Sequence, residues 1–235
     1  MAATTPPSTS PPAETKASPP LSRFDGLERA VHWINAGLFL ILILTGAALY
    51  FEPLMALVGR RALMERIHID AGLALPVPIV FALAGSWGKR MRADLRRFNR
   101  WTEDDGMWLR VTFRGRAERA AARVNLKEGK FNAGQKLNAA FTGGAILVML
   151  GTGAIMRWFH PFPLSWRTGA TFVHNWLFVA IVVVIVGHVA FALSDRDALG
   201  SMFTGRISDD WARRRAPGWW QELHPARSGG SESSK

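Results

Sequence analysis

The chain has 235 residues, of which 49% are hydrophobic, and it carries 29 Lys and Arg against 18 Asp and Glu, a formal net charge of +11. Because the mean hydropathy is only +0.07, the apolar residues must be gathered into blocks, which argues against an ordinary soluble domain. The absence of cysteine excludes disulfides, thiolate zinc sites, iron–sulfur ligation and covalent c-type haem attachment within this chain.

Residues 1–22 are rich in Pro, Ser, Thr and Ala and show no apolar period, so we expect a disordered N-terminal tail. Four apolar blocks follow, each close to the roughly 20 residues that cross a hydrocarbon core of about 30 Å. We therefore expect an all-α integral membrane protein, a four-transmembrane-helix bundle in one domain over residues 23–200. Its helices are predicted at about residues 30–51, 67–87, 136–157 and 169–194.

The basic residues predict the orientation of the bundle. Between the second and third helices, residues 88–136 hold 14 Lys and Arg but only six Asp and Glu, whereas the loops on the other side are poor in basic residues. Because positive loops stay on the cytoplasmic side, loop 88–135 and both termini are expected in the cytoplasm, including a C-terminal tail at 201–235. This topology explains most of the net charge without nucleic-acid binding, and the remainder suits a protein partner or anionic lipid.

Four of the six histidines fall at matched depths in the predicted helices. His32 begins the outward first helix, and His68 begins the inward second helix. The inward fourth helix meets His174 near the periplasmic face and His188 near the cytoplasmic face. By depth, His32 therefore pairs with His188, and His68 pairs with His174.

The spacing within the fourth helix favours two haem groups. Fourteen residues at about 1.5 Å each place His174 and His188 roughly 21 Å apart along the axis and on nearly the same face. Paired imidazoles on facing helices suit haem iron, and without cysteine these would be two b haems. The alternatives are hydrogen-bonding contacts between helices, or a proton path in a haem-free membrane anchor or transporter.

Two further residues lie close to these levels. Gly46 follows His32 by fourteen residues on the same helix, so it could admit a porphyrin edge at the other level or simply allow close helix packing. Arg29 precedes His32 by about one turn, where it could neutralise a haem propionate or anchor the helix end.

The stretch "KFNAGQKLN" at 130–138 leads into the third helix from the cytoplasmic side. Asn132 and Gln135 are three residues apart and share a helix face, so their amides could hydrogen-bond a quinone carbonyl near the cytoplasmic haem. Asn132 could equally be an N-cap of that helix.

Four stretches together resemble the cytochrome b (gamma) subunit of membrane-bound formate dehydrogenases. They are "RFDGLERAVHW" at 23–33, "KFNAGQK" at 130–136, the fourth helix with His174 and His188, and "GRISDDWARRRAPGWW" at 205–220. The resemblance covers most of the chain between the first and last of these stretches.

This resemblance implies four membrane helices, two haem b groups held by the same two histidine pairs, and quinone reduction near the cytoplasmic haem. It places the quinone pocket at Asn132, Gln135 and the neighbourhood of His188. It also implies an iron–sulfur (beta) partner subunit and a molybdenum- or tungsten-containing catalytic (alpha) subunit on the periplasmic side. Formate oxidation would then occur in another chain, and this subunit would be a multi-pass protein of the bacterial inner membrane.

Two departures from the family pattern stand out. The histidine pair usual after "WAR" is replaced by Arg214 and Arg215, and the Pro-rich N-terminus is additional. Neither concerns a proposed ligand. The same kind of cytochrome serving a nickel–iron hydrogenase or a thiosulfate reductase remains an alternative.

Overall fold

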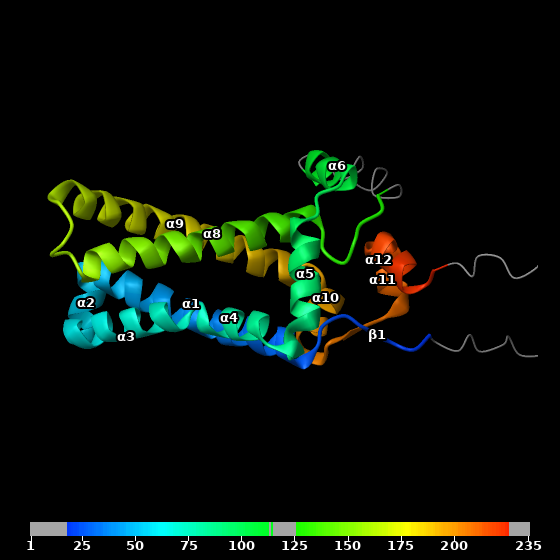
Figure 1. Cartoon of the computed structure of the whole chain (residues 1–235), viewed down its shortest axis with the longest axis horizontal. Coiled ribbons are helices and arrows are strands. Elements are labelled where there is room, and N and C mark those ends of the chain that lie inside the picture. The colour runs from blue at the N-terminus through cyan, green and yellow to red at the C-terminus, as the bar shows by residue number, and fades with distance from the viewer. Residues whose placement is uncertain (1–17, 113, 115–125, 226–235) are drawn as a thin grey trace, which may run out of the picture.

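The computed structural model describes residues 18–112, 114 and 126–225, and within them it is almost entirely helical (Figure 1). Four segments of this described part are long and apolar enough to cross a membrane, and they lie side by side as a bundle. They are Gly26–Tyr50 (α1), Arg61–Ala84 (α3 and α4), Ala133–Arg157 (α8) and Leu164–Leu193 (α9). The prediction of a helical protein with four candidate membrane helices is confirmed.

The outer surface of the bundle is apolar. Leu44 of α1, Leu147 of α8 and Val183 of α9 have exposed fractions of 61%, 71% and 66%. Water would disfavour so much exposed apolar surface, whereas lipid tails accept it. The bundle therefore has the surface of a multi-pass membrane protein.

The second span is interrupted, although the sequence suggests one continuous helix at 67–87. It begins at Arg61 and is divided into α3 (Arg61–Ala74) and α4 (Val77–Ala84), with Pro76 between them. Proline has no N–H to donate, and its ring clashes with the carbonyl one turn earlier, which explains the break. A short 3-10 helix, η1 (Ser86–Gly88), follows α4.

The helices α1 and α8 begin earlier than their apolar blocks because their polar first turns are capped. α1 starts at Gly26 rather than at residue 30, since the side chain of Asp25 accepts from the backbone N–H of Glu28 and that of Glu28 accepts from the N–H of Asp25. This reciprocal pair satisfies two backbone donors that would otherwise lack partners. α9 starts at Leu164, directly after Pro163.

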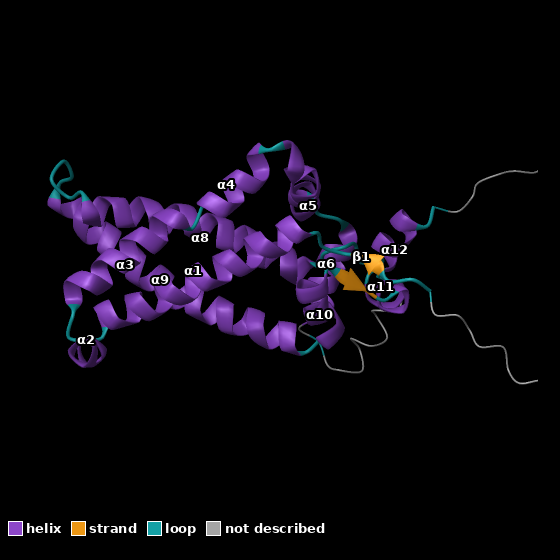
Figure 2. Cartoon of the chain, turned by 90° about the horizontal axis from the view of Figure 1, so that it is seen from below, coloured by secondary structure: helices purple, strands orange, loops and turns teal. Residues whose placement is uncertain are grey.

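The connecting elements gather mainly at one end of the bundle. The short helix α2 (Glu52–Val58) lies at the opposite end, between α1 and α3 (Figure 2). The crowded end holds β1 (Leu21–Ser22), α5 (Lys89–Asn99), α6 (Glu103–Thr112), α10 (Arg196–Thr204), β2 (Arg206–Ile207), α11 (Asp209–Arg215) and α12 (Pro217–Leu223). There α5 runs across the bundle rather than along it (Figure 1). Both described ends of the chain and the segment between α4 and α8 thus share one end.

Residues 21 and 22, at the end of the predicted disordered tail, are instead ordered as β1. Leu21 pairs with Ile207 and Ser22 with Arg206 in an antiparallel two-stranded sheet. The turn before β2 is made by Gly205 with φ of +77°, a left-handed conformation that glycine adopts easily. The prediction of disorder for residues 1–17 lies outside the described residues.

Arg23, directly after β1, is 2% exposed and is held by the C-terminal helices. Its guanidinium carbon lies 4.4 Å from the centroid of the Trp211 ring, and Nη1 donates to Ser201 Oγ over 3.3 Å. Burial lowers the pKa of Arg23 to about 10, while Asp195 and Asp94 raise it. This packing ties the start of α1 to α10 and α11.

Candidate functional site

Two pairs of histidines face each other inside the bundle. The ring centroids of His32 on α1 and His188 on α9 are 6.3 Å apart, and those of His68 on α3 and His174 on α9 are also 6.3 Å apart. Because α9 is one continuous helix, the fourteen residues between its two histidines separate the pairs by about 21 Å. The structure brings the four side chains together as two pairs at separate levels.

The spacing within each pair fits a metal bound between the rings. Two imidazoles on opposite sides of one ion, with metal–nitrogen bonds of about 2.0 Å, have centroids roughly 6 Å apart. Within the described residues, no group of three or more His, Cys, Asp or Glu side chains could hold a bare ion. Iron in a porphyrin brings its own equatorial ligands and needs only two axial ones, so the residues present fit haem.

A cavity of about 590 Å³ lies beside the pair formed by His68 and His174. It is lined by both imidazoles and mainly by apolar side chains of α1, α3, α8 and α9. Arg61, Glu65 and Arg157 also line it; Arg61 pairs with Glu65 at 2.9 Å, and Arg157 is exposed. The cavity thus combines two imidazoles, mainly apolar walls and the basic Arg157, which is a suitable lining for a planar apolar group with acidic substituents.

Two glycines keep the space beside these rings open. A Cβ on Gly46 would lie 3.3 Å from Cε1 of His68 and 3.5 Å from the Phe178 ring, and a Cβ on Gly153 would lie 3.5 Å from Cε1 of His174. Both glycines line the cavity. Gly46 therefore lies on the same helix as His32 but at the level of the other pair, where a larger side chain would displace the ring or enter the cavity.

Two threonines that the sequence reasoning missed contact the same pair. The Oγ1 of Thr45 is 2.9 Å from Nδ1 of His68, and the Oγ1 of Thr152 is 2.9 Å from Nδ1 of His174. Thr45 directly precedes Gly46 in the sequence, and Thr152 directly precedes Gly153. Thr-Gly-Ala occurs at 45–47, 152–154 and 168–170, and Thr168 bonds back to its own helix, so this triplet alone did not identify the two threonines.

Arg29 is engaged at the end of the bundle rather than free beside a histidine. Its Nη1 donates to the carbonyl oxygen of Phe203, and its Nε donates to that of Asp25 over 3.2 Å. Of its two possible roles, these contacts favour anchoring of the helix end, because they tie the start of α1 to the end of α10.

Asn132 and Gln135 form a reciprocal cap at the start of α8. Asn132 Oδ1 accepts from the backbone N–H of Gln135 over 3.0 Å, and Gln135 Oε1 accepts from the backbone N–H of Asn132 over 3.1 Å. The N-cap interpretation of Asn132 is therefore correct. The cap uses only the amide oxygens, and within the described part of the chain neither side-chain NH₂ group has a hydrogen-bond partner.

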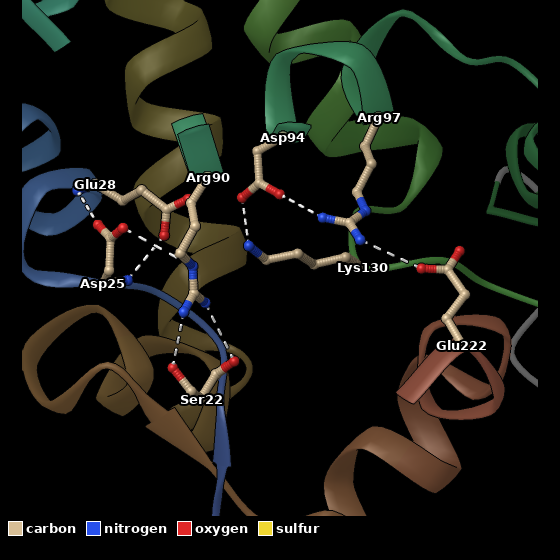
Figure 3. Close-up of polar contacts among 8 residues, drawn as sticks. All are labelled: Ser22, Asp25, Glu28, Arg90, Asp94, Arg97, Lys130 and Glu222. Carbon is tan, nitrogen blue, oxygen red and sulfur yellow. Dashed lines mark hydrogen bonds and ion pairs between the residues drawn. The ribbon is translucent and has the colours of Figure 1, made fainter. Parts of the chain in front are cut away.

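Buried ion pairs hold this start of α8 in place. Lys130 pairs with Asp94 of α5, which also accepts from Arg97 over 2.9 Å, and Arg97 reaches Glu222 of α12 at 3.4 Å (Figure 3). Burial lowers the pKa of Lys130, and the neighbouring Asp94 carboxylate opposes that shift. These contacts fix the chain two residues before Asn132.

A second buried pair acts from α6. Lys136 Nζ donates to Asp105 Oδ2 over 2.7 Å and to the carbonyl oxygen of Arg100 over 2.9 Å. The side chains of Lys136 and Asp105 are 9% and 7% exposed. The segment before α8 and the first turn of α8 are thus held by two helices of the predicted cytoplasmic loop.

Comparison with known proteins agrees with this arrangement. Residues 23–205 match the prokaryotic cytochrome b561 family. The chain is 25% identical over 210 residues to the formate dehydrogenase, cytochrome b556(fdo) subunit, of Escherichia coli K12, covering 86% of this chain and 92% of the relative. It is 24% identical over 211 residues to the nitrate-inducible cytochrome b556(Fdn) subunit of the same organism, covering 86% and 91%. A Haemophilus influenzae formate dehydrogenase cytochrome b556 subunit is 23% identical over 202 residues, covering 83% and 79%. The resemblance to formate dehydrogenase cytochrome b subunits is confirmed.

Proposed function

Because the chain belongs to the prokaryotic cytochrome b561 family, which implies haem b binding, we propose that it is the di-haem b subunit of a formate dehydrogenase complex. In this role it carries electrons from a partner iron–sulfur subunit across the membrane to quinone. The observation that supports this most strongly is the pair of facing imidazoles at each of two levels, both levels sharing α9.

In this proposal His32 and His188 would hold one haem, and His68 and His174 would hold the other. A haem bound at each level supplies a one-electron carrier. The surrounding helices hold the imidazoles in fixed positions, and Gly46 leaves room beside His68 for the edge of the macrocycle.

The quinone site of this proposal is the start of α8. Asn132 and Gln135 offer amide N–H donors, because their oxygens are used in the helix cap. A quinone carbonyl accepts such hydrogen bonds, and the buried ion pairs of Lys130 and Lys136 keep the donors in place. The start of α8 lies at the same end of the bundle as the start of α1, which bears His32 (Figure 1).

The proposed orientation places this end in the cytoplasm. It carries both described ends of the chain and the strongly basic segment between α4 and α8 (Figure 1), and basic segments stay inside. The partner subunits, an iron–sulfur protein and a molybdenum- or tungsten-containing catalytic protein, then bind at the opposite, periplasmic end of an inner-membrane complex. The names of the relatives support formate as the electron donor.

Purification of the chain from its native membrane with its bound partners tests this function. We expect reduced-minus-oxidised spectra of b-type haem and co-purification of an activity that oxidises formate and reduces quinone. A preparation with b haem but with a hydrogen-oxidising or thiosulfate-reducing activity would show that this cytochrome serves another enzyme instead of a formate dehydrogenase. A preparation without haem would overturn the proposal.

A further inference from the structure

A threonine followed by a glycine lies beside each histidine of the pair formed by His68 and His174. Thr-Gly-Ala occurs at 45–47 in α1, at 152–154 in α8 and at 168–170 in α9, and the threonines of the first two contact histidines. The first threonine contacts His68 on α3 and the second contacts His174 on α9, both at 2.9 Å from Nδ1. Each ring of this pair is thus held by a neighbouring helix in the same way.

The threonine hydroxyls lie where they can select which imidazole nitrogen carries the proton. Thr45 Oγ1 lies 2.7 Å from the carbonyl oxygen of Ile41, and Thr152 Oγ1 lies 2.8 Å from that of Val148. A carbonyl only accepts, so in the arrangement that leaves Nε2 free for iron each hydroxyl donates its single proton there and accepts at its other contact. The donor of that contact is the Nδ1–H of the imidazole, which leaves the Nε2 lone pair free.

We propose that Thr45 and Thr152 are positioning residues that hold His68 and His174 in the Nδ1-protonated tautomer and direct both Nε2 lone pairs to one iron. This inference rests on the proposed function, since it requires haem at this level. A hydrogen bond from the second nitrogen makes an imidazole a stronger electron donor to a metal. Stronger donation stabilises the oxidised iron and therefore lowers the reduction potential at this level.

The other pair lacks these partners. Among the described residues, the rings of His32 and His188 have no hydrogen bond to a side chain. The two levels therefore differ in ligand donation although their ring spacings are equal. The inference predicts that the haem held by His68 and His174 has the lower reduction potential. In the proposed orientation electrons enter at this level, so their transfer toward the quinone end is favourable.

Potentiometric titration of the purified complex, followed at the haem b absorption band, tests the inference. His68→Ala removes one of the two midpoints and identifies the level to which it belongs. In Thr45→Val and in Thr152→Val, we expect that midpoint to rise. The midpoint should rise by up to about 59 mV, which for one electron is a tenfold change in the oxidised-to-reduced ratio at a fixed potential. The other midpoint should stay unchanged, and Thr45→Ser and Thr152→Ser should keep the wild-type value.

Thr168→Val is the matched control. Thr168 lies on α9, the helix of His174, and its hydroxyl donates to the carbonyl oxygens of Leu164 and Ser165 at 3.1 Å, as a threonine does when it bonds back to its own helix. This variant should leave both midpoints unchanged.

The outcomes separate this inference from the proposed function. A wild-type complex without b haem contradicts the proposed function. Two haems whose midpoints stay fixed in both valine variants contradict the inference alone. If a valine variant loses the haem of this level, retention of that haem at its wild-type potential in the serine variant supports the role of the hydroxyl. Loss of the haem in the serine variant as well would overturn it.

Discussion

Lys130 and Asp94 form an ion pair next to the start of α8, and Asp94→Asn removes its negative charge. The two side chains are 3% and 6% exposed, so the substitution leaves a buried ammonium without its paired carboxylate. Removal of one partner from a buried pair costs about 3–5 kcal/mol, and the low end applies because asparagine keeps an acceptor oxygen. Glu65→Gln is the control, because the Arg61–Glu65 pair is 62% and 49% exposed and such a pair contributes at most about 1 kcal/mol.

Hydrogen exchange of the backbone amides at residues 126–136 measures this loss in the purified complex. A destabilisation of about 3 kcal/mol corresponds to roughly a hundredfold faster exchange, since 1.36 kcal/mol is a factor of ten. Quinone reduction should fall in Asp94→Asn while the haem content is kept, because the ion pair holds the amides of Asn132 and Gln135 rather than the histidines. Exchange rates equal to those of Glu65→Gln would refute this reasoning.

Three other outcomes are expected. Gly46→Leu should lose only the haem of the His68 and His174 level, because the leucine side chain enters the cavity. Gly37→Leu on the same helix should keep both haems, since a Cβ at Gly37 meets no atom within 4 Å. The haem content of the two variants measures the difference. Asn132→Asp with Gln135→Glu should raise the KM for quinone about tenfold without loss of stability, because carboxylates keep the helix cap but lack N–H donors; steady-state kinetics with unchanged unfolding curves would show it. Burial lowers the pKa of Lys130 in the folded protein below its usual 10.5. Between the folded pKa and 10.5 the unfolded chain binds more protons than the folded protein, so the free energy of unfolding rises with pH. Denaturation measured up to pH 10.5 should show this rise, and Lys130→Met should reduce it.

The parts of this fold that follow from local pattern are predictable from the sequence. Uncharged blocks about 20 residues long indicate the four helices, because backbone groups in lipid must be satisfied within the helix. The fourteen-residue spacing of His174 and His188 places both on one face of α9 through helix geometry alone. Their partners, His32 and His68, then follow from depth, because the spans alternate in direction.

Contacts between segments distant in sequence are not predictable in this way. Lys130 and Asp94 are 36 residues apart, and no periodic pattern joins them before α5 is known to lie across the bundle. A single threonine in an apolar helix ordinarily bonds back to its own backbone, so Thr45 gave no separate signal. Pro76 was a visible signal for the break between α3 and α4, but the length of the apolar block favoured one helix.

The haem content of the purified complex tests the central proposal most directly. The wild-type chain should hold two b haems, and His174→Ala and His188→Ala should each lose one of them, with a different midpoint remaining in each variant. A chain without b haem, or the same haem content and midpoints in the wild type and both variants, would contradict the proposal that the paired histidines of α9 hold iron at two levels.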